Sequence, residues 1–256
     1  MAVVLITGSA DGLGKFAAQR LVKAGHEVVL HARNVARGRE AMAAVPGARA
    51  VVVGDLSTLA EMKSVAGQAN EWGRFDAVIH NAAVGLKEGR KETVDGIEHV
   101  FAINTLAPYV LTALIQRPGR LIYLSSSLHQ SGNPDLGDLN WTHRRWNGGQ
   151  AYSDTKLHDV LLAFAVARRW PEVYSNALEP GWVATRMGGP GAPDDLAKGS
   201  ETQVWLAASD ETAAKVSGGY FFHLKERAVS AAARDPARQD ELLRSCEEMS
   251  GVALPR

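Results

Sequence analysis

The chain has 256 residues, a length that suits one α/β domain or at most two small ones. Its 28 basic and 28 acidic side chains cancel, which argues against a nucleic-acid partner, and its apolar run at 2–6 is too short for a signal peptide or a membrane span. The single cysteine, Cys246, excludes an intrachain disulfide and favours a reducing compartment. We therefore expect a soluble cytoplasmic protein with no nucleic-acid partner.

Short apolar runs alternate with segments of helical spacing along the chain. Strands are expected at 2–6, 27–32, 48–56, 76–82, 119–126, 172–180 and 218–222. Helices are expected at 12–24, 35–45, 57–72, roughly 94–116, 151–169 and near 200–208. Such alternation predicts a parallel sheet with helices on both faces, and right-handed crossovers make it doubly wound. We expect one Rossmann-type α/β domain over 1–256, with a seven-stranded parallel sheet.

Two later segments depart from the alternation. Residues 186–200 begin with a run rich in glycine and proline after the sixth strand. We expect them to form a substrate loop at the carboxyl ends of the strands, where doubly wound folds bind their ligands. Residues 225–256 are charged and helix-prone, and we expect a C-terminal tail there.

The segment LITGSADGLGKF, residues 5–16, places Gly8, Gly12 and Gly14 between the first strand and the first helix. Glycines at this junction allow a tight turn and let the backbone approach a pyrophosphate, which the helix N-terminus stabilises. The spacing differs from the commonest dinucleotide fingerprint, and an ordinary tight turn would use the same glycines. The strand–loop–helix context favours dinucleotide binding.

Charged residues after the second and third strands bear on which dinucleotide binds. Arg33 follows the second strand, where a carboxylate would hold the ribose of NAD, and its guanidinium could instead hold a 2′-phosphate. Asp11 in the glycine loop opposes a nearby phosphate, and Arg33 could be an ordinary surface residue. Asp55 could reach the adenine amine or cap the following helix. We expect NADP(H) in preference to NAD(H).

The segment QAYSDTKLHD, residues 150–159, carries Tyr152 and Lys156 four positions apart, so they share one helix face. A nearby ammonium favours the phenolate form of a tyrosine, which suits proton transfer. Alone, such a pair is usually an ordinary surface pair. Three features raise its significance. Serines at 125–127 end the fifth strand, and a turn at Pro180–Gly181 after the sixth strand lets Thr185 reach a carboxamide or phosphate. Pro108 removes the helical donor of the Asn104 carbonyl, which could then hold a water, although a plain kink is the alternative.

The histidines favour no metal site. His129, His143 and His158 match no zinc pattern, and no cysteine cluster accompanies them. His129 follows the serines at the end of the fifth strand, so it could line a substrate pocket.

Taken together and in order, these motifs resemble the short-chain dehydrogenase/reductase family over about residues 2–222. The long interval between the serines and Tyr152, with its Asp-Leu-Asn stretch at 138–140, resembles the retinol dehydrogenase-like branch. The resemblance rests on TGSADGLG (7–14), HNAAVG (80–85), the Asn104 segment, the serines at 125–127, YSDTK (152–156) and PGWVAT (180–185).

The resemblance implies an Asn104–Ser126–Tyr152–Lys156 tetrad, with Ser125 and Ser127 as alternatives to Ser126. With the motifs above, it predicts that the dinucleotide is bound by Gly8, Ser9, Asp11, Gly12, Leu13, Gly14, Arg33, Asp55, Leu56, Asn81, Ala82, Ala83, Asn104, Tyr152, Lys156, Pro180, Gly181, Val183 and Thr185.

The expected function is hydride transfer between NADP(H) and a small carbonyl or alcohol, with Tyr152 as the acid/base. The alternative is a catalytically silent regulator that senses a dinucleotide on the same fold. The resemblance also implies a homodimer or homotetramer, assembled through the helices expected at 94–116 and 151–169.

Overall fold

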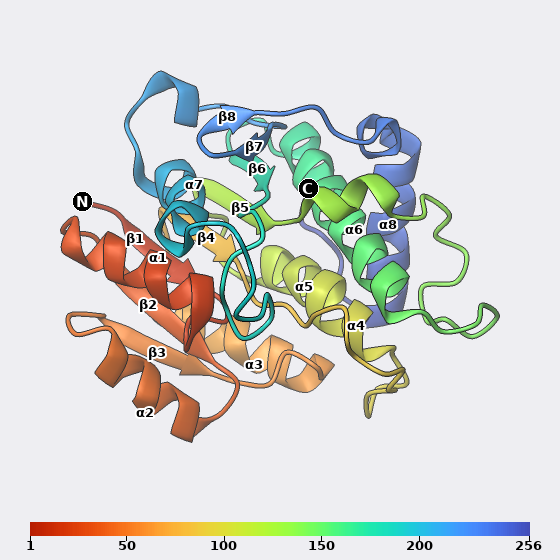
Figure 1. Ribbon diagram of the computed structural model, residues 1–256, viewed down its shortest axis with the longest axis horizontal. Coiled ribbons are helices and arrows are strands. Elements are labelled where there is room, and N and C mark those ends of the chain that lie inside the picture. Colours follow the sequence, from red (N-terminus) through yellow and green to blue (C-terminus); the bar gives the residue numbers. More distant parts are fainter.

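The computed structural model describes all 256 residues and contains one mixed sheet (Figure 1). The strand order is β3-β2-β1-β4-β5-β6-β7-β8, and every neighbouring pair is parallel except β7 and β8. The strands are β1 (Val3–Ile6), β2 (Glu27–Ala32), β3 (Ala50–Val53), β4 (Ala77–His80), β5 (Arg120–Leu124), β6 (Tyr174–Leu178), β7 (Tyr220–Phe222) and β8 (Lys225–Glu226). The predicted Rossmann-type fold is confirmed, although the tail adds an eighth, antiparallel strand to the expected seven.

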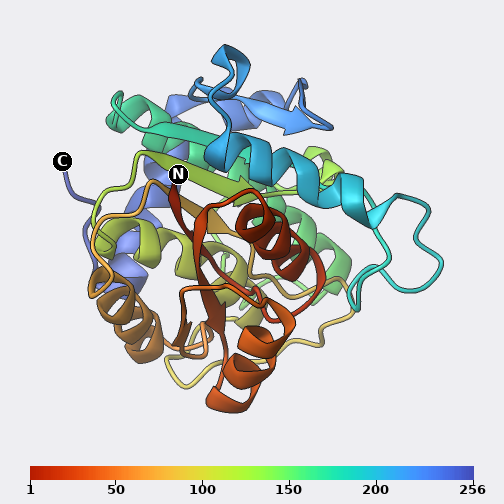
Figure 2. The same ribbon diagram turned by 90° about the vertical axis from the view of Figure 1, so that its left-hand side faces the viewer.

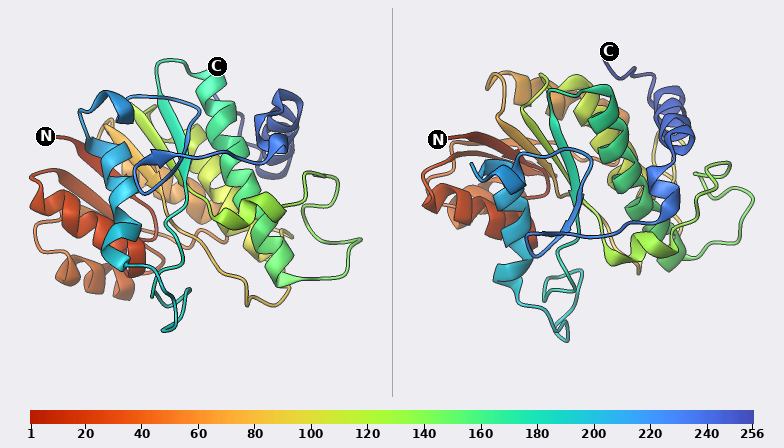
Figure 3. Two further views of the ribbon diagram at one scale, coloured as in Figure 1. Left: turned by 45° about the horizontal axis from the view of Figure 1, so that its top comes forward. Right: turned by 90° about the horizontal axis from the view of Figure 1, so that it is seen from above.

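Helices cover both faces of this sheet. Helices α1, α2 and α7 lie on one face, and α3, α5 and α6 lie on the other, with α8 packed outside α6 (Figure 3). The helices are α1 (Gly12–Lys23), α2 (Val35–Ala44), α3 (Leu59–Asn70), α4 (His99–Phe101), α5 (Ala107–Leu114), α6 (Gly148–Arg169), α7 (Leu196–Ala208) and α8 (Pro236–Ser250). Short 3-10 helices are η2 (Ser127–Ser131), η3 (Thr212–Ala214) and η4 (Ala231–Arg234).

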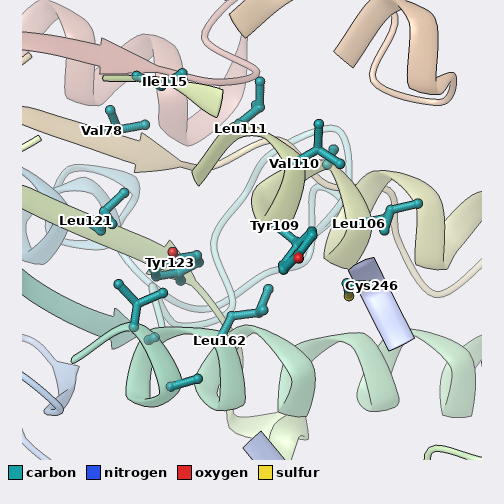
Figure 4. Packing of buried hydrophobic residues seen from close by; sticks show 14 of the residues in the cluster. Val78, Leu106, Tyr109, Val110, Leu111, Ile115, Leu121, Tyr123, Leu162 and Cys246 are labelled. Carbon is teal, nitrogen blue, oxygen red and sulfur yellow. The ribbon is translucent and has the colours of Figure 1, made fainter. Parts of the chain in front are cut away.

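Successive residues of the central strands point to opposite faces of the sheet and pack against different layers of helices. On β4, Val78 packs into the core under α5 and α6, while its neighbours Ala77 and Ile79 pack under α1 and α7. Figure 4 shows Val78, with Leu121 and Tyr123 of β5, among side chains of α5 and α6. Because both faces are buried, these strands read as continuous apolar runs rather than as alternating ones.

The helix expected over roughly 94–116 is not continuous, so that expectation was wrong. It begins at α4, widens into the π-helical turn η1 (Ala102–Leu106), and resumes as α5. The Ala107 N–H bonds to the Ala102 carbonyl five residues back. Pro108 follows the π turn in the same run of helix and contributes no N–H to its hydrogen bonds. The π turn brings the Asn104 side chain to the site described below.

Two irregular segments frame the carboxyl edge of the sheet. Residues 132–147 connect η2 to α6 (Figure 1), and residues 179–195 connect β6 to α7 (Figure 2). The substrate loop expected at 186–200 therefore ends at Asp195, because 196–200 belong to α7. None of the helices combines the length and the apolar character needed to cross a membrane.

Candidate active site

The glycine loop closes tightly against the end of β4. Gly8 has a φ of +61°, and a Cβ there would lie 2.8 Å from the Cα of Ala82. A Cβ on Gly14 would lie 2.5 Å from Nδ2 of Asn81, which donates hydrogen bonds to the carbonyls of Thr7 and Gly8 at 2.9 and 3.0 Å. Both positions therefore require glycine, and Asn81 holds the loop shut.

A histidine that the sequence analysis missed fixes the loop from the other side. Nε2 of His31 lies 2.9 Å from the carbonyl of Gly54, which can only accept, so this nitrogen carries the proton. Nδ1 then accepts the N–H of Gly8 at 2.9 Å. Burial lowers the pKa of His31 and keeps the ring neutral. Ser9 completes the frame by accepting the His31 N–H and donating to the Ile6 carbonyl.

The ion pairs near the loop leave Arg33 unpaired. Asp11 is paired with Arg37 at 2.7 Å, and Arg37 is also paired with Glu40. Arg33 is exposed at the end of β2 and forms no ion pair. The acidic residue in the loop is therefore neutralised locally, and Arg33 remains available to an anionic ligand.

Three residues of the predicted cofactor set, Asp55, Leu56 and Leu13, differ in whether their side chains are available to a ligand. Asp55 accepts the Ser57 N–H at 3.0 Å, and Thr58 rather than Asp55 caps α3. The side chain of Leu56 is buried in the core, while Leu13 lies close to Gly199 of α7. The carboxylate of Asp55 thus orders its own turn and keeps one oxygen without a hydrogen bond in the chain.

Asn104 ties three segments together. Its Oδ1 accepts the Val84 N–H at 2.8 Å, and its Nδ2 donates to the Val84 carbonyl and to Oγ1 of Thr155 at 3.0 and 3.1 Å. The residue is 1% exposed. The side chain is therefore committed to positioning the segment after β4 against α6.

The three serines after β5 have different surroundings. Ser125 is buried and donates to the carbonyl of Lys156 at 2.7 Å, so its hydroxyl is already used. Ser126 is partly exposed, and its Oγ accepts the Leu128 N–H at 3.3 Å, which leaves its own proton free to donate. Ser127 is exposed. The geometry thus favours Ser126 or Ser127 over Ser125 as the hydroxyl that meets a substrate.

Tyr152 and Lys156 face the end of β5 from α6. Nζ of Lys156 lies 5.5 Å from the centre of the Tyr152 ring and donates to the Leu124 carbonyl at 2.7 Å. It also pairs with Asp159 at 2.7 Å, and both side chains are 3% exposed. Burial raises the pKa of Asp159 to about 6, and the Lys156 charge opposes that rise. The structure thus gives Lys156 a buried carboxylate partner.

The PGWVAT segment returns to the glycine loop. Gly181 has a φ of +84°, and Asp194 accepts the Trp182 N–H at 2.6 Å, which closes the turn after Pro180. Val183 is buried, and a Cβ on Gly12 would lie 3.5 Å from Cγ2 of Thr185. Residues more than 170 positions apart in the predicted cofactor set therefore meet at one edge of the sheet.

This arrangement fits a dinucleotide. The loop offers backbone without side chains at Gly8, Gly12 and Gly14, at the start of α1, where a pyrophosphate is stabilised. Lys156, which lies under the Tyr152 ring, is bonded to the end of β5 at the same edge of the sheet. A family model described as short chain dehydrogenase matches residues 2–137.

Comparison with known proteins agrees with this geometry. An uncharacterized oxidoreductase of Emericella nidulans is 44% identical over 260 residues, which cover 100% of this chain and 99% of the relative. Human retinol dehydrogenase 13 is 30% identical, over 98% of this chain and 85% of its own. A crystal structure of an uncharacterized protein from Mycobacterium paratuberculosis superimposes with a TM-score of 0.87 at 26% identity, covering 100% of this chain and 96% of the other. The chain belongs to the short-chain dehydrogenase/reductase family, in its retinol dehydrogenase-like branch, and is an NAD(P)-dependent oxidoreductase acting on alcohols or carbonyls.

Proposed function

We propose that this chain is an NADP(H)-dependent carbonyl reductase or alcohol dehydrogenase in which Tyr152 is the general acid/base. The observation that carries the proposal is the position of Lys156. Its buried ammonium lies beneath the Tyr152 ring and is anchored to the last carbonyl of β5, directly before the serines. An ammonium in this place attracts the negative charge that Tyr152 carries after its proton has passed to the substrate.

Each residue has a separate task in reduction. Ser126 donates a hydrogen bond to the substrate oxygen and stabilises the negative charge that develops there. Tyr152 donates its proton to that oxygen, and Lys156 holds the charge that the phenolate acquires. The nicotinamide of the bound dinucleotide supplies the hydride. Asn104 keeps the segment after β4 in register with α6 through its bonds to Val84 and Thr155.

The preference for NADP(H) is supported by the free cation after β2. Arg33 forms no ion pair, whereas the one acidic residue of the glycine loop, Asp11, is already paired with Arg37. An additional phosphate on the ribose would therefore meet an available guanidinium and a neutralised carboxylate. Arg is well suited to this contact because its planar fork binds phosphate oxygens in pairs.

The Tyr152→Phe variant tests the acid/base role. We expect the turnover of a panel of aldehydes and ketones to fall at least about a thousandfold, because the ring stays and only the transferable proton is lost. NADPH affinity, followed by the fluorescence of the bound cofactor, should stay within about threefold of wild type.

The same panel separates the two candidate functions. Turnover that survives in Tyr152→Phe would refute the role of the phenol. A wild-type protein that binds NADPH but reduces no carbonyl would favour the dinucleotide-sensing regulator instead.

A further inference from the structure

The ammonium of Lys156 is almost completely shielded from solvent. Only 3% of its side chain is exposed, and Nζ lies 2.7 Å from both the Leu124 carbonyl and the carboxylate of Asp159. Burial favours the neutral amine, so a buried lysine without a negative partner gives up its proton easily. In the proposed function Lys156 must nevertheless stay charged, because it attracts the negative charge of Tyr152.

Asp159 supplies the only ion pair of Lys156. Burial by itself lowers the pKa of Lys156, but the Asp159 charge opposes this effect, and the pKa lies above the usual value for lysine. Burial raises the pKa of Asp159 to about 6, so above that pH the carboxylate is ionised and the pair carries both charges. The charge of the ammonium thus depends on a residue outside the predicted tetrad.

Two tyrosines face this pair from different elements. Tyr152 lies one turn before Lys156 on α6, with its ring centre 5.5 Å from Nζ. Tyr123 of β5 lies within reach of the Asp159 charge, and burial raises the pKa of Tyr123, so its hydroxyl stays neutral. Behind Tyr123, with ring centres 4.8 Å apart, burial lowers the pKa of His80 on β4 and keeps that ring neutral. Asp159 is therefore the one ionised carboxylate beside the ammonium.

We propose that Asp159 is a positioning residue that keeps the ammonium of Lys156 charged and directed at the end of β5. An ammonium has three hydrogens, and Asp159 and the Leu124 carbonyl each accept one, so the third stays uncommitted. A neutral amide at position 159 could hold Nζ in place, but it could not offset the cost of burying a charge. The use of this charge rests on the proposed function, whereas the charge itself can be measured separately.

The variant Asp159→Asn removes the charge and keeps a hydrogen-bond acceptor. The titration of Lys156 is followed by NMR of the full chain with isotopically labelled lysine, and its signal is identified by its loss in Lys156→Met. In the wild type we expect Lys156 to stay protonated to at least about pH 9.5. In Asp159→Asn we expect it to lose its proton with a midpoint between about pH 7 and pH 8.5.

The same variant is then assayed for carbonyl reduction with NADPH. We expect the ratio of its kcat to that of the wild type to fall at least about tenfold between pH 6 and pH 9, because the ammonium is lost over this range. A merely structural defect would lower this ratio equally at both pH values. Asp159→Glu restores the carboxylate, so it should recover most of the loss at pH 9.

Asp154→Asn is the matched control. Asp154 is a second buried carboxylate of α6, and it pairs with Arg144 at 3.1 Å. Arginine keeps its charge throughout this pH range, so the loss of its partner cannot change its protonation. The ratio of the kcat of Asp154→Asn to that of the wild type should therefore be the same at pH 6 and pH 9, even if this variant melts at a lower temperature.

The outcomes separate this proposal from the proposed function. A Lys156 that titrates in Asp159→Asn as it does in the wild type would overturn the proposal. Early loss of the proton, followed by kcat, would support it. Early loss with an unchanged kcat ratio would also support the pairing, but it would refute the part that the proposed function gives to the ammonium.

A double variant covers the case in which Asp159→Asn does not fold. Asp159→Asn combined with Lys156→Met leaves no charge buried at this place, so it should melt at a higher temperature than Asp159→Asn alone. A double variant that is no more stable than the single one would overturn the proposal, because the defect would then not come from an unpaired ammonium.

Discussion

The glycine loop and the cavity beside Ser126 lie at the same edge of the same sheet, yet their polar groups are treated differently. Around the loop, Ser9, His31 and Asn81 use their side chains to bond neighbouring backbone. The cavity, of about 420 Å³, is instead lined by side chains of mixed character, among them His129, Glu179 and Arg227. The loop region is complete in the protein alone, and the cavity is open space that a ligand can enter.

This difference shows how the two regions divide the work of binding. A frame whose hydrogen bonds are already made loses little conformational freedom when a ligand arrives, so it binds through preorganisation. An open cavity lined by charged, polar and aromatic side chains instead selects a ligand by its shape and polarity. We therefore expect the glycine loop to set affinity for the dinucleotide and the cavity to set discrimination among substrates.

The strongest way to break the comparison is to open the completed region with Gly14→Ala. The new Cβ would lie 2.5 Å from Nδ2 of Asn81 and 2.6 Å from the Gly8 carbonyl, so the bonds that close the loop must shift. We expect NADPH affinity, measured by titration, to fall at least about a hundredfold.

Gly67→Ala on α3 is the matched control for Gly14→Ala. A Cβ at Gly67 meets nothing within 4 Å, so this helix position should tolerate alanine and gain up to about 1 kcal/mol of stability. NADPH affinity near the wild-type value in Gly14→Ala would show that the loop does not depend on its tight closure.

A second test concerns His80, which is an exception within the completed region. Nε2 of His80 meets the Thr112 hydroxyl at 3.0 Å, but Nδ1 has no partner. Burial lowers the pKa of His80 from 6.5 to about 3. Below pH 6.5 the unfolded chain takes up a proton that the folded chain refuses until about pH 3, so stability is lost as the pH falls.

The variant His80→Asn removes this contribution. Between pH 7 and pH 5, the free energy of unfolding of the wild type should drop by about 2 kcal/mol more than that of the variant. Urea unfolding at the two pH values measures the difference. Parallel losses in both proteins would mean that His80 is protonated in the folded state as readily as in the unfolded one.

The smallest expected effect is on cofactor preference, through Arg33, which follows β2 beside the glycine loop. Because Arg33 is exposed, its contact with a 2′-phosphate is partly screened by solvent. We expect wild type to prefer NADPH over NADH in kcat/KM, and Arg33→Ser to reduce that preference about tenfold by raising the KM for NADPH. The control is Arg39→Ser, which replaces an exposed arginine of α2 and should leave the NADPH-to-NADH ratio of kcat/KM unchanged. A wild-type preference for NADH would overturn the cofactor assignment.

Features that depend on neighbours in the chain were predictable, and features that depend on distant contacts were not. The glycine loop follows from glycine spacing between a strand and a helix, and the structure shows why Gly8 and Gly14 admit no Cβ. The π turn could not be foreseen, because Asn104 is held by Val84 and Thr155, which lie far from it in sequence.

The same reason explains what was missed around the proposed catalytic residues. The spacing of Lys156 and Asp159 is visible in the sequence, but only the fold shows that both are buried and therefore paired. His129 was predicted to line a substrate pocket, and in the structure it lines the cavity of about 420 Å³. Its partner Tyr220 lies on β7, and no local pattern connects the two residues.

Helix α8 changes what the outer surface of the molecule can do. It packs along α6 and α5, and its own residue Cys246 is buried (Figures 1 and 4). After the helix, the carbonyls of Val252 and Pro255 accept hydrogen bonds from Tyr109 and Trp170. Residues 151–166 of α6 are all buried within the single chain. Within the single chain α8 therefore occupies the outer side of α6, one of the two helices through which a second copy was expected to pair.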